Sequence, residues 1–315
     1  MNIVFMGTPE FAVASLRALV SSKHNVVGVV TVADKPAGRG KKMRASAVKE
    51  YAVEQGIKVL QPVKLRDQDF IASLKAMHAD VFVVVAFRML PMLVWEIPSR
   101  GTFNIHGSLL PQYRGAAPIN YAIINGDKES GLTTFMIDEK IDTGKIILQR
   151  KCSISDTDDV GDLHDRLMLM SESIVVDTVD MIEQNKIDLI PQEVAAKDIE
   201  LRPAPKIFKE NCKIPSKIAV AKAYNLIRGL SPYPASFLKI VSPTGEEFIM
   251  KVFKTQKIDQ PSKVGEIYTD GKKEFEIGFS DGRLRVLMLQ LQSKKRMAVG
   301  DFLRGFSINN DWKWA

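Results

Sequence analysis

The sequence of 315 residues lacks the marks of a membrane protein or of a disulfide-rich secreted protein. Its longest uninterrupted apolar run, Val81–Phe87, is far shorter than the ~18 residues that a membrane-spanning helix requires. The two cysteines, Cys152 and Cys212, are too few for a disulfide framework or a zinc site. No basic segment precedes Glu10, so a secretory leader is not indicated. These absences predict a cytoplasmic protein that does not bind membranes.

Cofactor-binding motifs are also missing. The turn after the first predicted strand reads Gly7-Thr8-Pro9, and positions 7, 9 and 12 are Gly, Pro and Ala, so the three-glycine dinucleotide fingerprint is absent. This argues against a nicotinamide-dependent enzyme. No H-x-x-x-H, C-x-x-C or paired-carboxylate motif supports a metal site, and we expect none.

Positive charge is concentrated in the last third of the chain. Residues 207–315 contain 19 Lys and Arg against 11 Asp and Glu, whereas the rest of the chain carries one net negative charge. A basic region attached to a nearly neutral one predicts a polyanionic partner. The alternative is a solvated surface that keeps the protein soluble.

The first 150 or so residues alternate apolar, β-branched runs with amphipathic stretches. This pattern predicts an α/β domain with a doubly wound parallel sheet covered by helices. A long helix is then predicted over 157–183. The other predicted elements are strands at Asn2–Met6, Asn25–Val32 and Val81–Phe87, and helices at Pro9–Ser22 and Asp67–Met77.

Beyond a Pro-containing stretch, the pattern changes to short β-rich runs. A helix is predicted from Ser216, as N-cap, to Arg228. Four runs follow, separated by turn signals such as Asp270-Gly271 and Asp281-Gly282. They predict a smaller β-barrel of the oligonucleotide-binding type, although a sandwich gives the same signal. We expect a domain at 1–185, a linker at 186–206 and a basic C-terminal domain at 207–315.

The strongest candidate for chemistry is Phe103-Asn104-Ile105-His106-Gly107. The alternation predicts a strand end from which Asn104 and His106 project on one face. An amide and an imidazole can stabilise an oxyanion at an acyl carbon, although a hydrogen-bonded structural histidine is the alternative. A carboxylate would complete the site, and the spacing does not choose between Asp138 and Asp142. Asp142 also has the sequence context of a turn former.

Two loops add candidate binding residues. Ser108-Leu109-Leu110-Pro111 follows the histidine and offers apolar side chains and backbone groups to a flat ligand, or packs as an ordinary loop. The segment Asp34–Arg44 carries five basic residues against one acidic residue. Its two glycines and its proline predict an irregular loop suited to phosphate contacts, with a plain charged surface loop as the alternative.

Several segments together resemble the methionyl-tRNA formyltransferase family. The main one is residues 103–120, FNIHGSLLPQYRGAAPIN. The Asn-x-His plus Asp combination resembles all folate-dependent formyltransferases, whereas the basic loop and the C-terminal domain resemble the transfer-RNA enzyme. Further matching segments are Gly7-Thr8-Pro9, Asp34–Lys42, Asp142-Thr143-Gly144, Tyr224–Pro234 and Leu291–Met297.

The resemblance implies a Rossmann-like formyltransferase domain and a C-terminal, oligonucleotide-binding-like barrel that binds tRNA. It implies transfer of a formyl group from the co-substrate 10-formyltetrahydrofolate to methionine on initiator tRNA. The implied products are tetrahydrofolate and the formylated tRNA used in translation initiation. A monomer is the default expectation. The matching catalytic positions are Asn104, His106 and Asp142; the folate-binding positions are Ser108, Leu109, Leu110 and Pro111; the tRNA-binding positions are Lys35, Arg39, Lys41, Lys42 and Arg44.

One departure from the family pattern is Ala86-Phe87-Arg88, where the family more commonly has Ala-Tyr-Gly. Two other functions compete with the one implied. A folate-dependent formyltransferase for a small amine, such as an amino sugar or glycinamide ribonucleotide, would not need the basic C-terminal domain. A non-enzymatic RNA-binding protein would keep the fold without formyl transfer, yet all three candidate catalytic residues are present.

Overall fold

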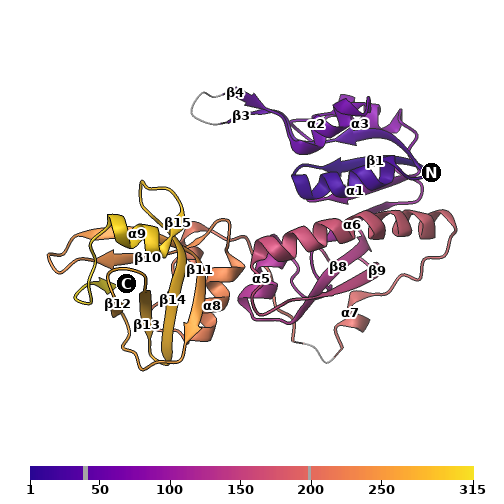
Figure 1. Cartoon of the computed structure of the whole chain (residues 1–315). Helices are drawn as coiled ribbons and strands as arrows, with labels where there is room; N and C mark the ends of the chain where they lie inside the picture. Colours follow the sequence, from indigo (N-terminus) through magenta and orange to yellow (C-terminus); the bar gives the residue numbers. More distant parts are fainter. Residues whose placement is uncertain (38–41, 198–199) are drawn as a thin grey trace. The chain divides into compact units, whose positions relative to one another are not determined.

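The computed structural model describes residues 1–37, 42–197 and 200–315 (Figure 1). Contacts divide the chain into two compact units. The N-terminal unit comprises Met1–Pro118, Ser130–Cys152 and His164–Pro203. The C-terminal unit comprises Ile119–Glu129, Ser153–Leu163 and Ala204–Ala315.

The first 203 residues contain a mixed series of strands and helices. In chain order they are β1 (Asn2–Gly7), α1 (Glu10–Val20), β2 (Asn25–Val30), β3 (Lys35–Ala37), β4 (Lys42–Arg44), α2 (Ala47–Glu54), β5 (Val59–Leu60), α3 (Gln68–Lys75), β6 (Val81–Val85), α4 (Met92–Trp95), β7 (Thr102–His106), α5 (Pro118–Ile124), β8 (Glu129–Met136), β9 (Ile146–Ser153), α6 (Val160–Glu183) and α7 (Gln192–Ala195).

A seven-stranded sheet in the order β5-β2-β1-β6-β7-β8-β9 forms the centre of the N-terminal unit. The five strands from β5 to β7 are parallel, which confirms the predicted α/β, Rossmann-like class. β8 pairs antiparallel with β7 and extends the sheet. The sequence analysis did not predict β8 and β9. In β8 a glycine interrupts the apolar and threonine residues, and in β9 Gln149 and two charged residues follow a short apolar start, so that neither strand shows a continuous apolar run or a strict alternation.

The centre of the sheet is buried on both faces, as parallel sheets require. Residues 3–6 of β1 are fully buried. Val4 and Met6 pack with Phe70 and Leu74 of α3 on one face. Elsewhere in the unit, α1 and α6 meet through a buried hydrogen bond between Ser15 and Ser171.

The strand order reverses between β1 and β6, because β2 and β5 lie on one side of β1 in the sheet, whereas β6 and β7 lie on its other side. Ligands of such sheets bind beside this reversal, at the carboxyl ends of the strands. Gly7 ends β1 at this edge. A Cβ there would lie 2.8 Å from the Cβ of Ala12 and 3.0 Å from the carbonyl oxygen of Val85, so close packing explains the glycine.

The basic segment after β2 is more regular than the sequence predicted. β3 and β4 form an antiparallel hairpin in which Lys35 pairs with Arg44 (Figure 1). The prediction of an irregular loop was therefore wrong for the two ends of this segment. Pro36 is tolerated there because, in a ribbon of only two strands, its missing N–H costs few hydrogen bonds between the strands. Arg39 and Lys41 lie outside the described residues, and only the backbone of Lys42 is described.

The C-terminal part of the chain is mostly antiparallel. It contains η1 (Lys209–Cys212), α8 (Val220–Gly229), β10 (Ser236–Val241), β11 (Glu247–Ile258), β12 (Ile267–Thr269), β13 (Phe275–Phe279), β14 (Gly282–Leu291), β15 (Met297–Ala298), α9 (Val299–Gly305) and β16 (Lys313–Trp314).

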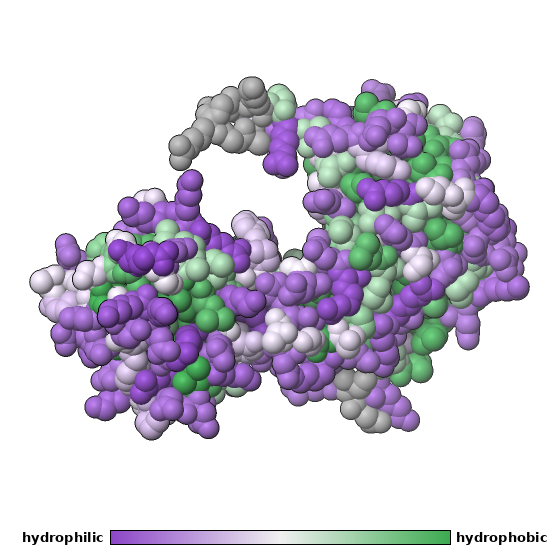
Figure 2. Space-filling model, in the orientation of Figure 1, coloured by the Kyte–Doolittle hydropathy of each residue, from purple (hydrophilic) through white to green (hydrophobic). Residues whose placement is uncertain are grey.

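These strands form a nearly closed barrel in the order β12-β13-β14-β11-β10-β16. A bridge between Glu266 and Lys313 and a 2.9 Å hydrogen bond from Trp314 N to Gly265 O join the two ends of the order. The predicted barrel is thereby confirmed over the alternative sandwich. In Figure 2 the visible face of this unit is mostly hydrophilic, in keeping with its exposed lysines, which include Lys254, Lys257, Lys272, Lys273, Lys294 and Lys295.

The start of α8 differs from the prediction. The helix begins at Val220 with Ala219 at the N-cap, so the predicted N-cap, Ser216, was wrong. The first helical N–H, that of Val220, donates to Asp281 Oδ1 at 2.9 Å. A carboxylate from a distant turn therefore caps the helix, and this is why the local sequence did not mark its start.

Across the three described ranges, we find no helix whose length and apolarity would let it cross a bilayer.

Candidate active site

Asn104 and His106 lie at the carboxyl end of β7, on the same face, as their spacing predicted. His106 is 5% exposed, and the ring of Phe135 packs edge-on against it with a centroid distance of 6.4 Å. Asn104 is half-buried. Within the described part of the chain its side-chain amide makes no hydrogen bond, so its N–H groups are available to a ligand.

The hydrogen bonding of His106 defines its tautomer. Nε2 lies 2.8 Å from the backbone carbonyl oxygen of Tyr113. Because a carbonyl oxygen only accepts, Nε2 carries the proton in neutral His106. The other nitrogen, Nδ1, lies 3.7 Å from Oδ2 of Asp142. Nδ1 is therefore the nitrogen that can gain or lose a proton during a reaction.

Asp142 belongs to the connection between β8 and β9. Its φ of 55° lies in the left-handed region, so it is a turn residue as well as a neighbour of His106. Its Oδ2 accepts a hydrogen bond of 2.9 Å from the N–H of Gly115. The 3.7 Å to His106 Nδ1 is too long for a direct hydrogen bond, but one water or one substrate atom is enough to link the two groups.

The structure also decides between the two aspartates that the sequence left open. Asp138 Oδ1 accepts hydrogen bonds from Lys140 N at 3.0 Å and Thr143 Oγ1 at 2.8 Å, so this carboxylate stabilises the turn. Asp142 is the one that approaches the imidazole. His106 and Asp142 thus lie close together, and Asn104 shares its strand face with His106.

The loop Ser108–Pro111 is held rigidly by Thr133 of β8. The Thr133 hydroxyl donates to Ser108 O at 2.7 Å and accepts from Leu110 N at 3.0 Å. Gln149 of β9 donates to Leu110 O at 2.8 Å. Ser108, Leu110 and Pro111 are buried, whereas Leu109 is half-exposed. The backbone groups of Ser108 and Leu110 and the hydroxyl of Ser108, which donates to Gln112 O, therefore fix the conformation of the loop that follows His106.

The described ends of the basic hairpin present positive charge to solvent. Lys35 and Arg44 are both exposed and lie opposite each other. Asp34, at the base of the hairpin, is bonded to Lys49 at 2.6 Å and to Gln61 at 2.7 Å. These hydrogen bonds, chiefly that of Lys49, lower the pKa of the Asp34 carboxyl.

Comparison with known proteins identifies the family of this chain. Residues 1–179 match the family described as "Formyl transferase", and residues 206–307 match "Formyl transferase, C-terminal domain". The chain is 52% identical to the methionyl-tRNA formyltransferase of Bacteroides thetaiotaomicron over 99% of its own length and 98% of that protein. It is 54% identical to that of Parabacteroides distasonis, over 97% and 96% of the two chains.

The chain belongs to the methionyl-tRNA formyltransferase family. Solved structures of more distant proteins share its fold. One is a sugar 3N-formyltransferase with a TM-score of 0.66 and 23% identity, covering 94% of this chain and 99% of that one. Another is an N-formyltransferase from Helicobacter canadensis with a TM-score of 0.64 and 21% identity, covering 90% and 98%.

Arg88 contacts the ring of Phe87 and the segment after β5. The Arg88 guanidinium donates to the backbone oxygens of Pro62 and Val63 and lies 5.6 Å from the centre of the Phe87 ring. Partial burial lowers its pKa. Arg88 therefore links the segment after β6 to the segment after β5 at the carboxyl edge of the sheet.

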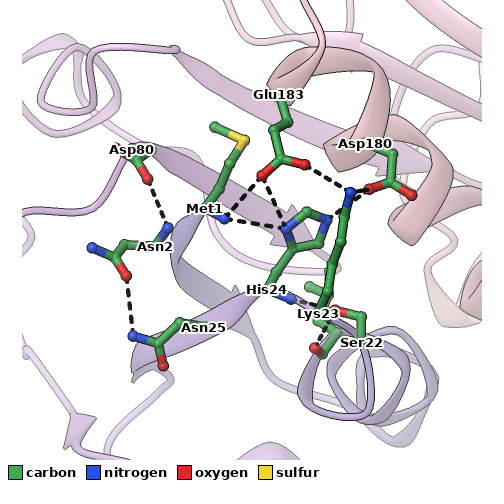
Figure 3. Close-up of polar contacts among 10 residues, drawn as sticks. Met1, Asn2, Ser22, Lys23, His24, Asn25, Asp80, Asp180 and Glu183 are labelled. Atoms are coloured by element: carbon green, nitrogen blue, oxygen red, sulfur yellow. Dashed lines mark hydrogen bonds and ion pairs between the residues drawn. The ribbon is translucent and has the colours of Figure 1, made fainter.

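A second polar cluster lies at the opposite ends of these strands. Figure 3 shows Lys23 and His24, between α1 and β2, pointing toward Asp180 and Glu183 near the end of α6. In the described ranges His24, Asp180 and Glu183 could hold a metal ion, since their ligand atoms lie within 4.8 Å of one another. Lys23 Nζ, however, lies 2.9 Å from Asp180 and 2.8 Å from Glu183 and supplies the positive charge. The cluster is an ion-pair network that fastens α6.

Sequence reasoning missed the residues that hold the catalytic candidates in place. Thr133 and Gln149 lie on strands that were not predicted. Gln192 lies in the segment interpreted as a linker, where it forms a short helix and is completely buried. No local pattern marks these residues, because their partners are far away in the sequence.

Proposed function

We propose that this protein transfers the formyl group of 10-formyltetrahydrofolate to the α-amino group of methionyl initiator tRNA, for translation initiation. The observation that carries the proposal is the placement of Asn104, His106 and Asp142 around the carboxyl end of β7. The full-length similarity to methionyl-tRNA formyltransferases, at 52% and 54% identity, supports the choice of substrates.

The reaction forms a bond between the amine nitrogen and the formyl carbon and breaks the bond from that carbon to N10 of the folate. In between, the formyl oxygen carries negative charge. Asn104 donates an amide N–H to this oxygen, and protonated His106 donates Nδ1–H to it. Both donors stand on one rigid strand, so little reorganisation is needed when the charge develops.

Two protons must move for the reaction to balance. The attacking amine loses one, and Asp142 accepts it directly or through a water. N10 of the folate gains one from His106 Nδ1 as tetrahydrofolate leaves. A water that links Asp142 Oδ2 and His106 Nδ1, which lie 3.7 Å apart, then returns the proton to the imidazole, and this restores the starting state.

The substrates contact the elements beside these groups. The folate lies against the loop Ser108–Pro111, whose conformation Thr133 fixes. The basic segment Asp34–Arg44 contacts the acceptor end of the tRNA, and the basic barrel contacts the tRNA backbone. The tRNA-binding positions of this segment are Lys35, Arg39, Lys41, Lys42 and Arg44. The family matches at 1–179 and 206–307 support a catalytic domain at 1–185, a linker at 186–206 and a tRNA-binding domain at 207–315.

We also propose that the protein works as a monomer in the cytoplasm, where charged tRNA is found. Sedimentation velocity of the purified chain tests the oligomeric state. A species of 35.1 kDa is expected, and a stable dimer would refute this part.

An assay with purified protein, 10-formyltetrahydrofolate and charged tRNA tests the function. Formylmethionyl-tRNA should form with initiator methionyl-tRNA much faster than with elongator methionyl-tRNA. Two results would refute the proposal. Formylation of an amino-sugar nucleotide but not of tRNA would favour the small-amine alternative. Tight tRNA binding without any formyl transfer would favour a non-enzymatic RNA-binding protein.

A further inference from the structure

The side chain of Gln192 is a buried amide whose hydrogen-bonding capacity is completely used. It is 0% exposed and lies on the short helix α7. Its Nε2 donates to the backbone oxygens of Asp142 at 2.9 Å and Gly144 at 2.8 Å. Its Oε1 accepts from Nε and from one terminal nitrogen of Arg114, at 2.9 Å and 2.7 Å. A primary amide has two donors and two acceptor sites, and all four are satisfied here.

These four hydrogen bonds join the two segments that hold the His106–Asp142 pair. One segment is the turn 142–144, which carries the Asp142 carboxylate. The other is 113–115, where Tyr113 O accepts from His106 Nε2 and Gly115 N–H donates to Asp142 Oδ2. Arg114, which donates to Gln192, is the residue between Tyr113 and Gly115 in the sequence. Gln192 therefore links both sides of the pair, although it touches neither the imidazole nor the carboxylate.

Local packing and backbone conformation restrict how far the turn 142–144 can move. Asp142 has a φ of 55°, and a Cβ at Gly144 would lie 1.6 Å from Met136 O. The turn is thus packed against β8 on one side and hydrogen-bonded to Gln192 on the other. Without the amide, the buried carbonyl oxygen of Gly144 and the partly buried one of Asp142 lose this donor, and the turn must shift or admit water to satisfy them.

We propose that Gln192 is a positioning residue that sets the placement of the Asp142 carboxylate relative to His106. The inference rests on the proposed function, because it concerns the same reaction. A displacement of about 1 Å in a catalytic group costs on the order of 100-fold in rate. The loss should fall on the chemical step, since Gln192 lies behind Asp142 and not in the loop assigned to the folate.

The test compares Q192M, which has similar volume and no hydrogen-bonding amide, with wild type in formylation of initiator methionyl-tRNA. We expect kcat to fall about 100-fold while KM for 10-formyltetrahydrofolate changes less than threefold. The control S171A loses the buried hydrogen bond between α1 and α6, remote from the site, and should lower Tm without changing kcat. A Q192M enzyme within threefold of the wild-type kcat would overturn the proposal.

A double-mutant cycle separates positioning from general damage to the fold. If Gln192 acts through Asp142, Q192M should cost less than threefold in kcat in the D142N background, because the group it positions is already lost. An undiminished 100-fold cost in that background would contradict the inference. Inactive wild-type protein would instead refute the proposed function itself.

A second variant covers the case in which Q192M does not fold. Q192E keeps the shape and the acceptor atoms facing Arg114, but it has no N–H for the carbonyl oxygens of Asp142 and Gly144. We expect Q192E to fold and to lose kcat about as strongly as Q192M. Wild-type turnover in folded Q192E would show that the two donated hydrogen bonds do not position Asp142.

Discussion

Replacing Asn104 with alanine tests the proposed stabilisation of the oxyanion. The side chain is half-buried and, within the described residues, makes no hydrogen bond in the free protein. Its loss therefore leaves no protein group unsatisfied, and the free energy of unfolding should fall by no more than about 1 kcal/mol. The effect on the transition state should be much larger, because a donor aimed at a developing oxyanion contributes about 2.7–4 kcal/mol.

This contribution corresponds to a 100–1,000-fold loss of rate. The assay is a single-turnover measurement with enzyme in excess over initiator methionyl-tRNA and with saturating 10-formyltetrahydrofolate, so that product release does not mask the chemical step. The matched control is N25A, because Asn25 is exposed and bonds Asn2 at the amino end of β2, at the opposite edge of the sheet. N25A should react at the wild-type rate.

A loss of less than tenfold in N104A, with Tm near that of wild type, would show that Asn104 is not an oxyanion donor. A large loss of rate accompanied by a large fall in Tm would be equally damaging. It would mean that the amide supports the fold and not the transition state.

Three further predictions concern the surroundings of the site and the charge of the chain. The variant T133V, which leaves the groups of Ser108 and Leu110 without their partner, should lower the free energy of unfolding by about 1–3 kcal/mol and raise KM for the folate, as measured by urea titration and steady-state kinetics. Removing Lys35 and Arg44 together should weaken tRNA binding and reduce the slope of log affinity against log salt by about 1 for each lost phosphate contact. Backbone N–H groups, first that of residue 274, lower the pKa of Asp270 from 3.8 to about 2. Because this folded-state pKa lies below the unfolded one, the urea midpoint of wild type should exceed that of D270A above about pH 4, and the gap should close as the pH falls toward 2.

The arrangement of side chains at the carboxyl end of β7 was predictable because it depends only on neighbouring residues. Strict alternation in Phe103–His106 places Asn104 and His106 on one face whatever the rest of the chain does. The buried strands β1 and β6 were also predictable, since a parallel sheet covered on both faces requires continuous apolar runs. In both cases a few neighbouring residues determine the structure.

The rest of the site depends on contacts between distant segments. Asp138 and Asp142 occupy the same turn, and only the approach of Gly115 and His106 distinguishes them. Gln192 is separated from Asp142 by 50 positions, and its four-residue helix has no detectable periodicity. The start of α8 likewise depends on Asp281, 61 positions away. Local propensity carries no information about such partners.

The most direct test of the account is a crystal structure of the protein with a stable analogue of 10-formyltetrahydrofolate that carries its formyl group on N10. We predict that the pterin end lies against residues 108–111 and that the formyl oxygen lies within about 3.5 Å of Asn104 Nδ2, with His106 Nδ1 and the Asp142 carboxylate on the same side of the formyl carbon. A folate bound elsewhere, or a formyl group more than about 6 Å from all three side chains, would contradict the proposal that these residues act together on one carbon.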